Sequence, residues 1–121
     1  MGKAITIDGV EYVEASEKEK NMANKFKKMK YIICRTQSAG VFAGYLEKRT
    51  GMEVVLRNAR RLWYWEGAAS LSQLSVDGVS TPDKCKFPVA VDRVELTQAI
   101  EILDVTRQAQ DSIKSVPIWK S

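Results

Sequence analysis

The chain of 121 residues contains no histidine. This absence removes the usual general base of enzymes, the Ser-His-Asp and Cys-His arrangements, and every zinc site with a histidine ligand. The acidic residues are dispersed without a paired-carboxylate motif, and neither a G-x-x-x-x-G-K-S/T loop nor a G-x-G-x-x-G turn is present. The sequence therefore predicts a protein that is not an enzyme and that uses no cofactor and no metal ion.

Cysteines and long apolar runs are also scarce. Cys34 lies in an apolar run and Cys85 in a loop rich in Pro, Asp and Lys, and the two form no C-x-x-C pair. We expect two free thiols, with Cys34 buried, as suits a reducing cytoplasm. No apolar run approaches the ~20 residues of a membrane span, and the N-terminus lacks the apolar core of a secretory signal. These absences predict a soluble intracellular protein that does not associate with membranes.

The positive charge is modest and concentrated in one segment. The formal net charge is +4, and residues 31–65 carry six basic and two acidic side chains. This excess is too small for a protein that neutralises many phosphates of duplex DNA, and it suits a small anionic ligand better. A chain of this length forms one domain with a modest core, so subunit contacts would add to a thin stability margin. We therefore expect a homo-oligomer, a dimer or a tetramer.

The hydrophobic pattern predicts an α+β fold: a small antiparallel meander sheet or partly open barrel with two or three short helices. Strands are expected at residues 31–37, 41–47, 52–65, 99–105 and 117–119, and helices at 68–75 and 107–115. Residues 1–30 are expected to form an appended hairpin, 3–15, and a charged helix, 16–30. Residues 31–121 would then be a single core domain.

Three guanidinium groups and three aromatic rings fall within the nine residues 57–65. Arginine forks match phosphate oxygens, and indole or phenol rings stack on bases. If 52–65 is a regular strand, alternation gives it one apolar core face with Leu62 and one face for ligand. The ligand face would carry Arg57, Arg61, Trp63 and Trp65. A one-residue bulge between Asn58 and Arg61 would exchange these roles.

Polar residues near this cluster complete the predicted site. Gly67 and Ser70 open the helix behind the rings, where backbone N–H groups suit an anion, and Gln73 offers hydrogen bonds to sugar or base. Arg35 and Ser38 lie at a polar strand end beside a glycine turn. The predicted ligand-binding residues are Arg35, Ser38, Arg57, Asn58, Arg60, Arg61, Trp63, Tyr64, Trp65, Gly67, Ser70 and Gln73.

Residues 31–119 resemble a family of small tailed-bacteriophage proteins through RTQSAGVFAGYLEKRTGMEVVLRNARRLWYWEGAASLSQL, KFPVAVDRVELTQAIEI and VPIW. The likeness covers about three quarters of the chain. Proteins of this type include anti-CBASS sponges, which keep cyclic oligonucleotide signals of bacterial immunity from their effectors. The resemblance implies an oligomeric, non-catalytic binder of a ligand such as a cyclic dinucleotide, held between subunits in the cytoplasm of the infected host.

Two other functions are compatible with the same residues. The cluster suits a small protein that binds single-stranded nucleic acid, whose affinity would fall steeply with salt. Alternatively, Trp63 and Trp65 fill a second apolar layer or a subunit interface of a structural protein, because indole is enriched at interfaces.

Overall fold

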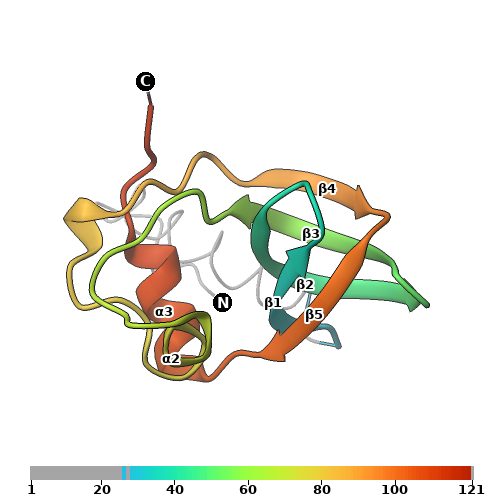
Figure 1. The fold of residues 1–121 in the computed structure, drawn as a ribbon, viewed down its shortest axis with the longest axis horizontal. Coiled ribbons are helices and arrows are strands. Elements are labelled where there is room, and N and C mark those ends of the chain that lie inside the picture. Colours follow the sequence, from blue (N-terminus) through green and yellow to red (C-terminus); the bar gives the residue numbers. More distant parts are fainter. Residues whose placement is uncertain (1–25, 27, 121) are drawn as a thin grey trace, which may run out of the picture.

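The computed structural model describes residue 26 and residues 28–120. The predicted hairpin at 3–15 and most of the predicted helix at 16–30 lie outside the described residues. Within these residues, five strands form one sheet, and two α-helices and a 3₁₀ turn lie beside it (Figure 1). In chain order the elements are β1 (Lys30–Thr36), β2 (Val41–Thr50), β3 (Glu53–Arg61), α2 (Leu71–Asp77), η2 (Pro82–Lys84), β4 (Val91–Leu96), β5 (Ala99–Asp104) and α3 (Arg107–Ser115). No described helix is long and apolar enough to cross a membrane.

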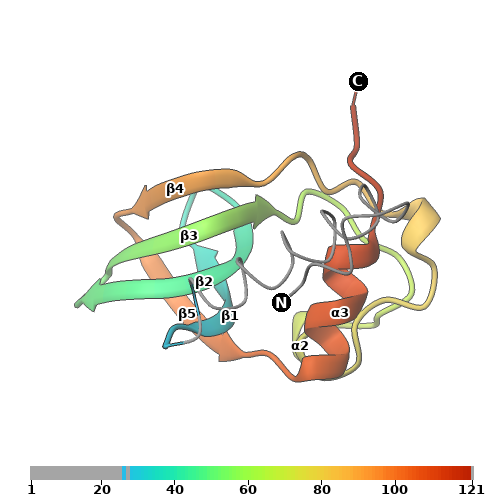
Figure 2. The ribbon, with the colours of Figure 1, turned by 180° about the vertical axis from the view of Figure 1, so that it is seen from behind.

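The sheet is antiparallel throughout, with the strand order β4-β3-β2-β1-β5. Only Thr97 and Gln98 join β4 to β5, although these strands are the two edges of the sheet. The sheet therefore has to curl, and Figures 1 and 2 show β4 and β5 meeting at one end. No ladder pairs β4 with β5 in the described part of the chain. The molecule is a small α+β fold with an open antiparallel sheet, as predicted.

Each face of the sheet packs on its own hydrophobic cluster at the central strands, whereas β4 is mostly exposed. Ile33 of β1 points to the side covered by α2 and α3, where Leu74, Phe87 and Ile113 pack. Its neighbour Ile32 points into the hollow of the curl. Strands buried on both faces have continuous apolar runs, which explains the run at 31–34. Both cysteines are buried and free, including Cys85, for which only a loop position was expected.

A β-bulge interrupts β3 at Asn58, whose φ of 49° lies in the left-handed region. The pairing with β2 shifts there, so that Asn58 and Ala59 together oppose Gly44. Asparagine is one of the few residues other than glycine that tolerate this backbone. A side chain at Gly44 would crowd the bulge, because its Cβ would lie 3.0 Å from the Cα of Ala59.

The inserted residue exchanges the two faces of β3 beyond it. Ala59 joins the residues that point into the curl, whereas Leu62 packs on the helix side. A regular strand would have placed Leu62 with the apolar residues that precede the bulge. The alternation expected for a regular strand therefore fails beyond Asn58, and the alternative of a one-residue bulge in this part of the strand, which exchanges the faces, is the one found. As a result, Arg57 and Arg61 lie on opposite faces of the strand.

Candidate functional site

The side chain of Arg60 is only 8% exposed and ends among backbone carbonyl groups. Its Nε donates to the oxygen of Pro88 (2.9 Å), Nη1 to that of Ile113 (2.9 Å), and Nη2 to those of Phe87 (3.0 Å), Val116 (2.7 Å) and Pro117 (3.0 Å). Burial lowers the pKa of this guanidinium. Its positive charge faces the C-terminal end of α3, where the helix dipole is negative. Because its donors are occupied, we do not retain Arg60 as a phosphate ligand.

The other two arginines of the predicted cluster have different partners. Arg57 donates to Glu47 at 3.2 Å and to Asp92 at 3.3 Å, and the hydrogen bond to Glu47 is the main reason that the pKa of Arg57 is raised. The guanidinium carbon of Arg61 lies 4.5 Å from the centroid of the Phe42 ring. Arg61 is exposed, and within the described residues it forms no ion pair. Of the three arginines, only Arg61 presents a free charge.

Two further predicted residues tie the β1–β2 end of the sheet to β5. The Nε of Arg35 donates to Glu101 at 2.8 Å, and the hydroxyl of Ser38 donates to Gln98 at 3.1 Å. Both side chains are exposed. Their partners explain Arg35 as a surface link between β1 and β5, and Ser38 as a link between the turn that follows β1 and the turn that precedes β5.

The small and polar residues after the rings form a helix cap. The hydroxyl of Ser70 accepts from the N–H of Gln73 (3.1 Å), and the amide oxygen of Gln73 accepts from the N–H of Ala69 (2.8 Å). This reciprocal pair resembles a capping box at the start of α2. Gly67 has a φ of 92°, and a Cβ there would lie 2.6 Å from the nitrogen of Ser80. These residues stabilise α2 and its approach, so we do not retain them as an anion site.

Two of the three rings of the predicted cluster, Trp63 and Tyr64, lie at the surface. Trp63 is 60% exposed and lies beside Trp119, with 5.9 Å between ring centroids and 34° between ring planes. The Nζ of Lys86 lies 5.6 Å from the ring centroid of Tyr64 and 5.7 Å from that of Trp119. We call Trp63, Tyr64, Lys86 and Trp119 the aromatic surface. It combines flat ring faces with one positive charge.

Three segments distant in sequence build this surface beyond the end of β3 (Figure 1). Tyr64 pairs with Lys86 in an antiparallel bridge, and Phe87 pairs with Ile118 in a parallel one. The N–H of Trp119 donates to the oxygen of Phe87 at 3.0 Å. The ring of Phe87 is fully buried below. The backbone therefore fixes the positions of the rings, of which Trp63 and Tyr64 are exposed and Trp119 is half-buried.

Sequence reasoning missed Lys86 and Trp119 as site residues and included Trp65, which is partly buried against the helix-side cluster. The alternative interpretation as an apolar layer thus describes Trp65. The only sequence signal for Trp119 was its place in the expected closing strand.

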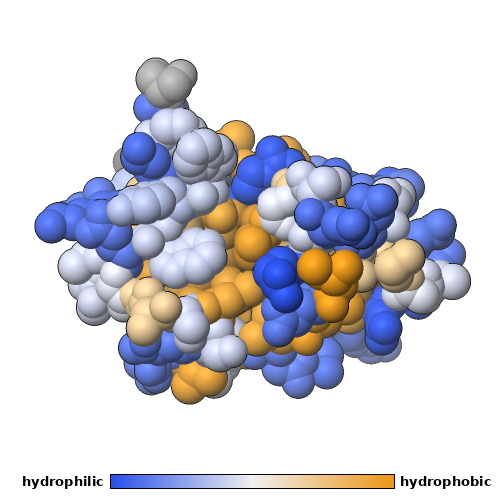
Figure 3. Space-filling view, viewed as in Figure 1, coloured by the Kyte–Doolittle hydropathy of each residue, from blue (hydrophilic) through white to orange (hydrophobic). Residues whose placement is uncertain are grey.

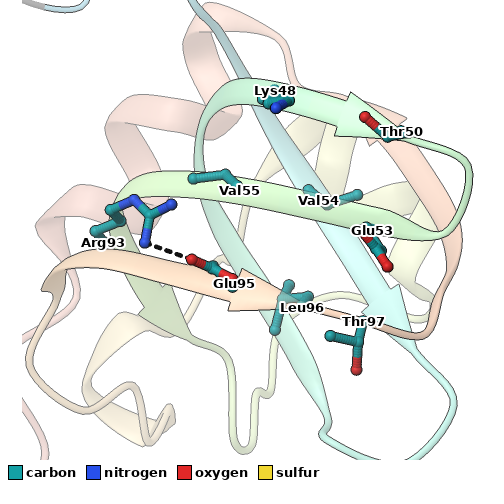
Figure 4. A pocket seen from close by; sticks show the side chains of 9 residues that line it. All are labelled: Lys48, Thr50, Glu53, Val54, Val55, Arg93, Glu95, Leu96 and Thr97. Carbon is teal, nitrogen blue, oxygen red and sulfur yellow. Dashed lines mark hydrogen bonds and ion pairs between the residues drawn. The ribbon is translucent and has the colours of Figure 1, made fainter.

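A cavity of about 360 Å³ lies over the ends of β2, β3 and β4 (Figure 4). Lys48 and Arg93 line it together with Glu53 and Glu95, and Arg93 donates to Glu95 at 2.7 Å. Because these charges cancel, the cavity is unsuited to an anionic ligand. In the described residues no group of three or more Cys, Asp or Glu side chains is placed to hold a metal ion.

The fold and the surface define a small α+β domain with an open antiparallel sheet and a cluster of exposed rings at one end. Residues 29–113 match the family described as a domain of unknown function, DUF6948, and the chain belongs to this family. Comparison with curated proteins and with solved structures finds no match. The family match includes Trp63, Tyr64 and Lys86 and ends before Trp119.

Proposed function

We propose that this protein is a non-enzymatic binding protein that stacks the base of a nucleotide ligand on its aromatic surface. The observation that carries the proposal is the exposure of Trp63, 60%, directly beside Trp119. A largely exposed indole beside a second, half-buried indole is typical of binding sites. Stacking of one base on an aromatic side chain contributes ~1–3 kcal/mol, which is enough to matter in a small site.

The charges near the rings favour an anionic ligand. Lys86 lies between the rings of Tyr64 and Trp119 and forms no ion pair in the described part of the chain. Arg61, two residues before Trp63, presents a second free cation. A ligand with both bases and phosphates fits these groups, and a cyclic oligonucleotide such as a cyclic dinucleotide has both. The resemblance to tailed-phage proteins supports the same ligand class.

In this proposal the protein acts as a sponge in the cytoplasm of an infected bacterium. It sequesters a cyclic oligonucleotide immune signal and so protects the phage from anti-phage defence. A homo-oligomer suits this role, because two copies supply two aromatic surfaces for a ligand with two bases. Sequestration needs tight binding and no chemical step.

Isothermal titration calorimetry with a panel of cyclic di- and trinucleotides tests the proposal. We expect Trp63→Ala and Trp119→Ala each to weaken binding about tenfold or more, because each removes a stacking face. Met52→Ala is the matched control, since Met52 is also exposed (58%) but lies in the turn between β2 and β3. Absence of heat with every cyclic nucleotide would refute this ligand class. Salt-sensitive binding of single-stranded oligonucleotides instead would identify a nucleic-acid-binding protein.

A subunit interface is the second candidate for the same surface. Val89 and Ile118, which neighbour it in sequence, are more than half exposed, and Figure 3 shows apolar side chains at the surface between the helices and the sheet. Exposed apolar area of this kind is also typical of contacts between copies. Analytical ultracentrifugation without ligand distinguishes the candidates. Loss of an oligomer in Trp119→Ala, with no nucleotide bound by the wild type, would favour the interface.

A further inference from the structure

A second cavity, of about 300 Å³, lies between β1, β3, the chain before β4 and the end of α3. Arg60 and Lys114 line it, together with Tyr31 and Asn58, and its apolar wall includes Val89 and Ile118. No carboxylate lines this cavity in the described part of the chain. It thus differs from the cavity of Figure 4, where acids and bases balance.

Neither cation of this cavity has a counter-ion among the described residues. The Nζ of Lys114 donates to the hydroxyl of Tyr45 at 2.6 Å and lies 5.4 Å from the ring centroid of Tyr31. Arg60 contacts carbonyl oxygens, which carry only partial charges. A buried charge that lacks an opposite charge is costly. Arg60 bears this cost, because it is buried, whereas Lys114 is exposed. An anion in the cavity would offset the cost for Arg60 and would pair with Lys114.

Two polar side chains of the cavity have no hydrogen-bond partner among the described residues, Tyr31 and Asn58. Tyr31 is only 8% exposed as a residue, but its hydroxyl is not fully buried and is therefore accessible to a ligand in the cavity that it lines. Burial raises the pKa of Tyr31, so its hydroxyl keeps its proton at neutral pH and can donate it. An unpaired phenol and an unpaired amide beside two cations match the needs of an oxyanion.

We propose that this cavity binds a small organic anion. Lys114, Tyr31 and Asn58 donate hydrogen bonds to its carboxylate or phosphate group. A short apolar part of the ligand lies against Val89 and Ile118. The volume lies at the lower end of the range for ligand sites, ~300–1,000 Å³, and so suits a small ligand. The site does not depend on the aromatic surface.

Titration of the full chain with inorganic phosphate and with butyrate, followed by NMR, tests this site. The side-chain amide signals of Asn58 are expected to shift and saturate with at least one probe. Lys114→Met, which keeps the apolar stem, is expected to weaken binding on the order of tenfold or more, the effect of losing a charged hydrogen bond. Asn58→Gly removes the amide but keeps the left-handed bulge, so it provides a second variant if Lys114→Met does not fold.

Lys48→Met is the matched control, because it removes a lysine from the charge-balanced cavity. Unchanged affinity in this control supports the proposal. An equal loss in Lys48→Met and Lys114→Met would show attraction by net charge alone and would overturn it. No saturable binding of either probe would overturn it as well. Trp63→Ala is expected to leave anion binding unchanged, so this proposal and the proposed stacking function fail separately.

Discussion

Replacing Arg60 by methionine is expected to destabilise the protein strongly, whereas the same change at Arg57 is not. Both side chains are arginines of β3, three residues apart, and methionine keeps much of the apolar stem in each case. Arg60 is buried among carbonyls, whereas Arg57 forms ion pairs with exposed carboxylates that water and salt screen, and donates to one exposed carbonyl, that of Asp92. Comparing the stability of the two variants tests whether the contribution of each arginine to stability follows from its hydrogen-bond acceptors.

The size of the effect follows from the acceptors that lose the guanidinium. Two of the five carbonyls, those of Phe87 and Ile113, keep a backbone N–H donor. Those of Pro88, Val116 and Pro117 accept no other hydrogen bond within the described residues. An unpaired buried acceptor costs ~1–3 kcal/mol, and water can reach the partly buried oxygens. We therefore expect a loss of about 3–5 kcal/mol, a large part of the ~5–15 kcal/mol of a small domain.

Urea unfolding followed by tryptophan fluorescence measures both variants. Arg57→Met is expected to unfold with nearly the wild-type midpoint. Arg60→Lys is expected to recover little, because an ammonium group cannot span carbonyls that a planar fork reaches. If Arg60→Met and Arg57→Met lose the same free energy of unfolding, the assignment of Arg60 as the link between β3 and the end of α3 is wrong.

Three further outcomes are expected. Asn58→Val should lower the free energy of unfolding in urea by about 1–3 kcal/mol, because a β-branched residue is strained at positive φ. Asn58→Gly should unfold like the wild type. Equal losses of stability in the two variants would contradict the bulge. Ser70→Ala should lower the free energy of unfolding by about 1 kcal/mol, because the helix cap is lost. Nucleotide titration of this variant should show unchanged affinity. Weaker binding would mean that Ser70 contacts the ligand after all. The pKa of Tyr31 is raised in the folded protein. Its contribution to the free energy of unfolding is therefore complete below about pH 10, the ordinary tyrosine pKa, and is lost as the pH rises above that value. Alkaline unfolding should therefore be shallower in Tyr31→Phe, and an unchanged pH dependence would contradict the burial of this phenol.

Local patterns predicted most of the elements. The expected strands at 31–37 and 41–47 correspond to β1 and β2, and the helix expected at 107–115 matches α3 with Thr106 as its cap. Periodicity, turn residues and caps act over a few neighbouring residues, so one sequence reveals them. The expected strand at 52–65 ends earlier, at Arg61, because the chain leaves the sheet for the bridge with Lys86.

The site was harder to predict because its residues depend on distant partners. Nothing in the local sequence distinguishes Arg60, which meets carbonyls from residues 87–117, from Arg57, which meets two carboxylates. One left-handed residue, Asn58, reverses the faces, and asparagine alone does not reveal a bulge. Lys86 and Trp119 come next to Trp63 and Tyr64 only after the long chain segments between them have folded. The aromatic character of the site was visible in sequence, but its neighbours were not.

The pairing of β1 with β5 also determines how late the sheet is completed. Ile32 lies opposite Asp104, so this ladder joins segments about 70 residues apart in sequence. β1, β2 and β3 can pair as soon as they leave the ribosome, but the outer edge of β1 stays open until β5 follows. An uncovered edge with apolar neighbours is prone to pair with other chains. We expect slow final closure, and aggregation during synthesis when β5 is weakened, even by changes that hardly affect the finished protein.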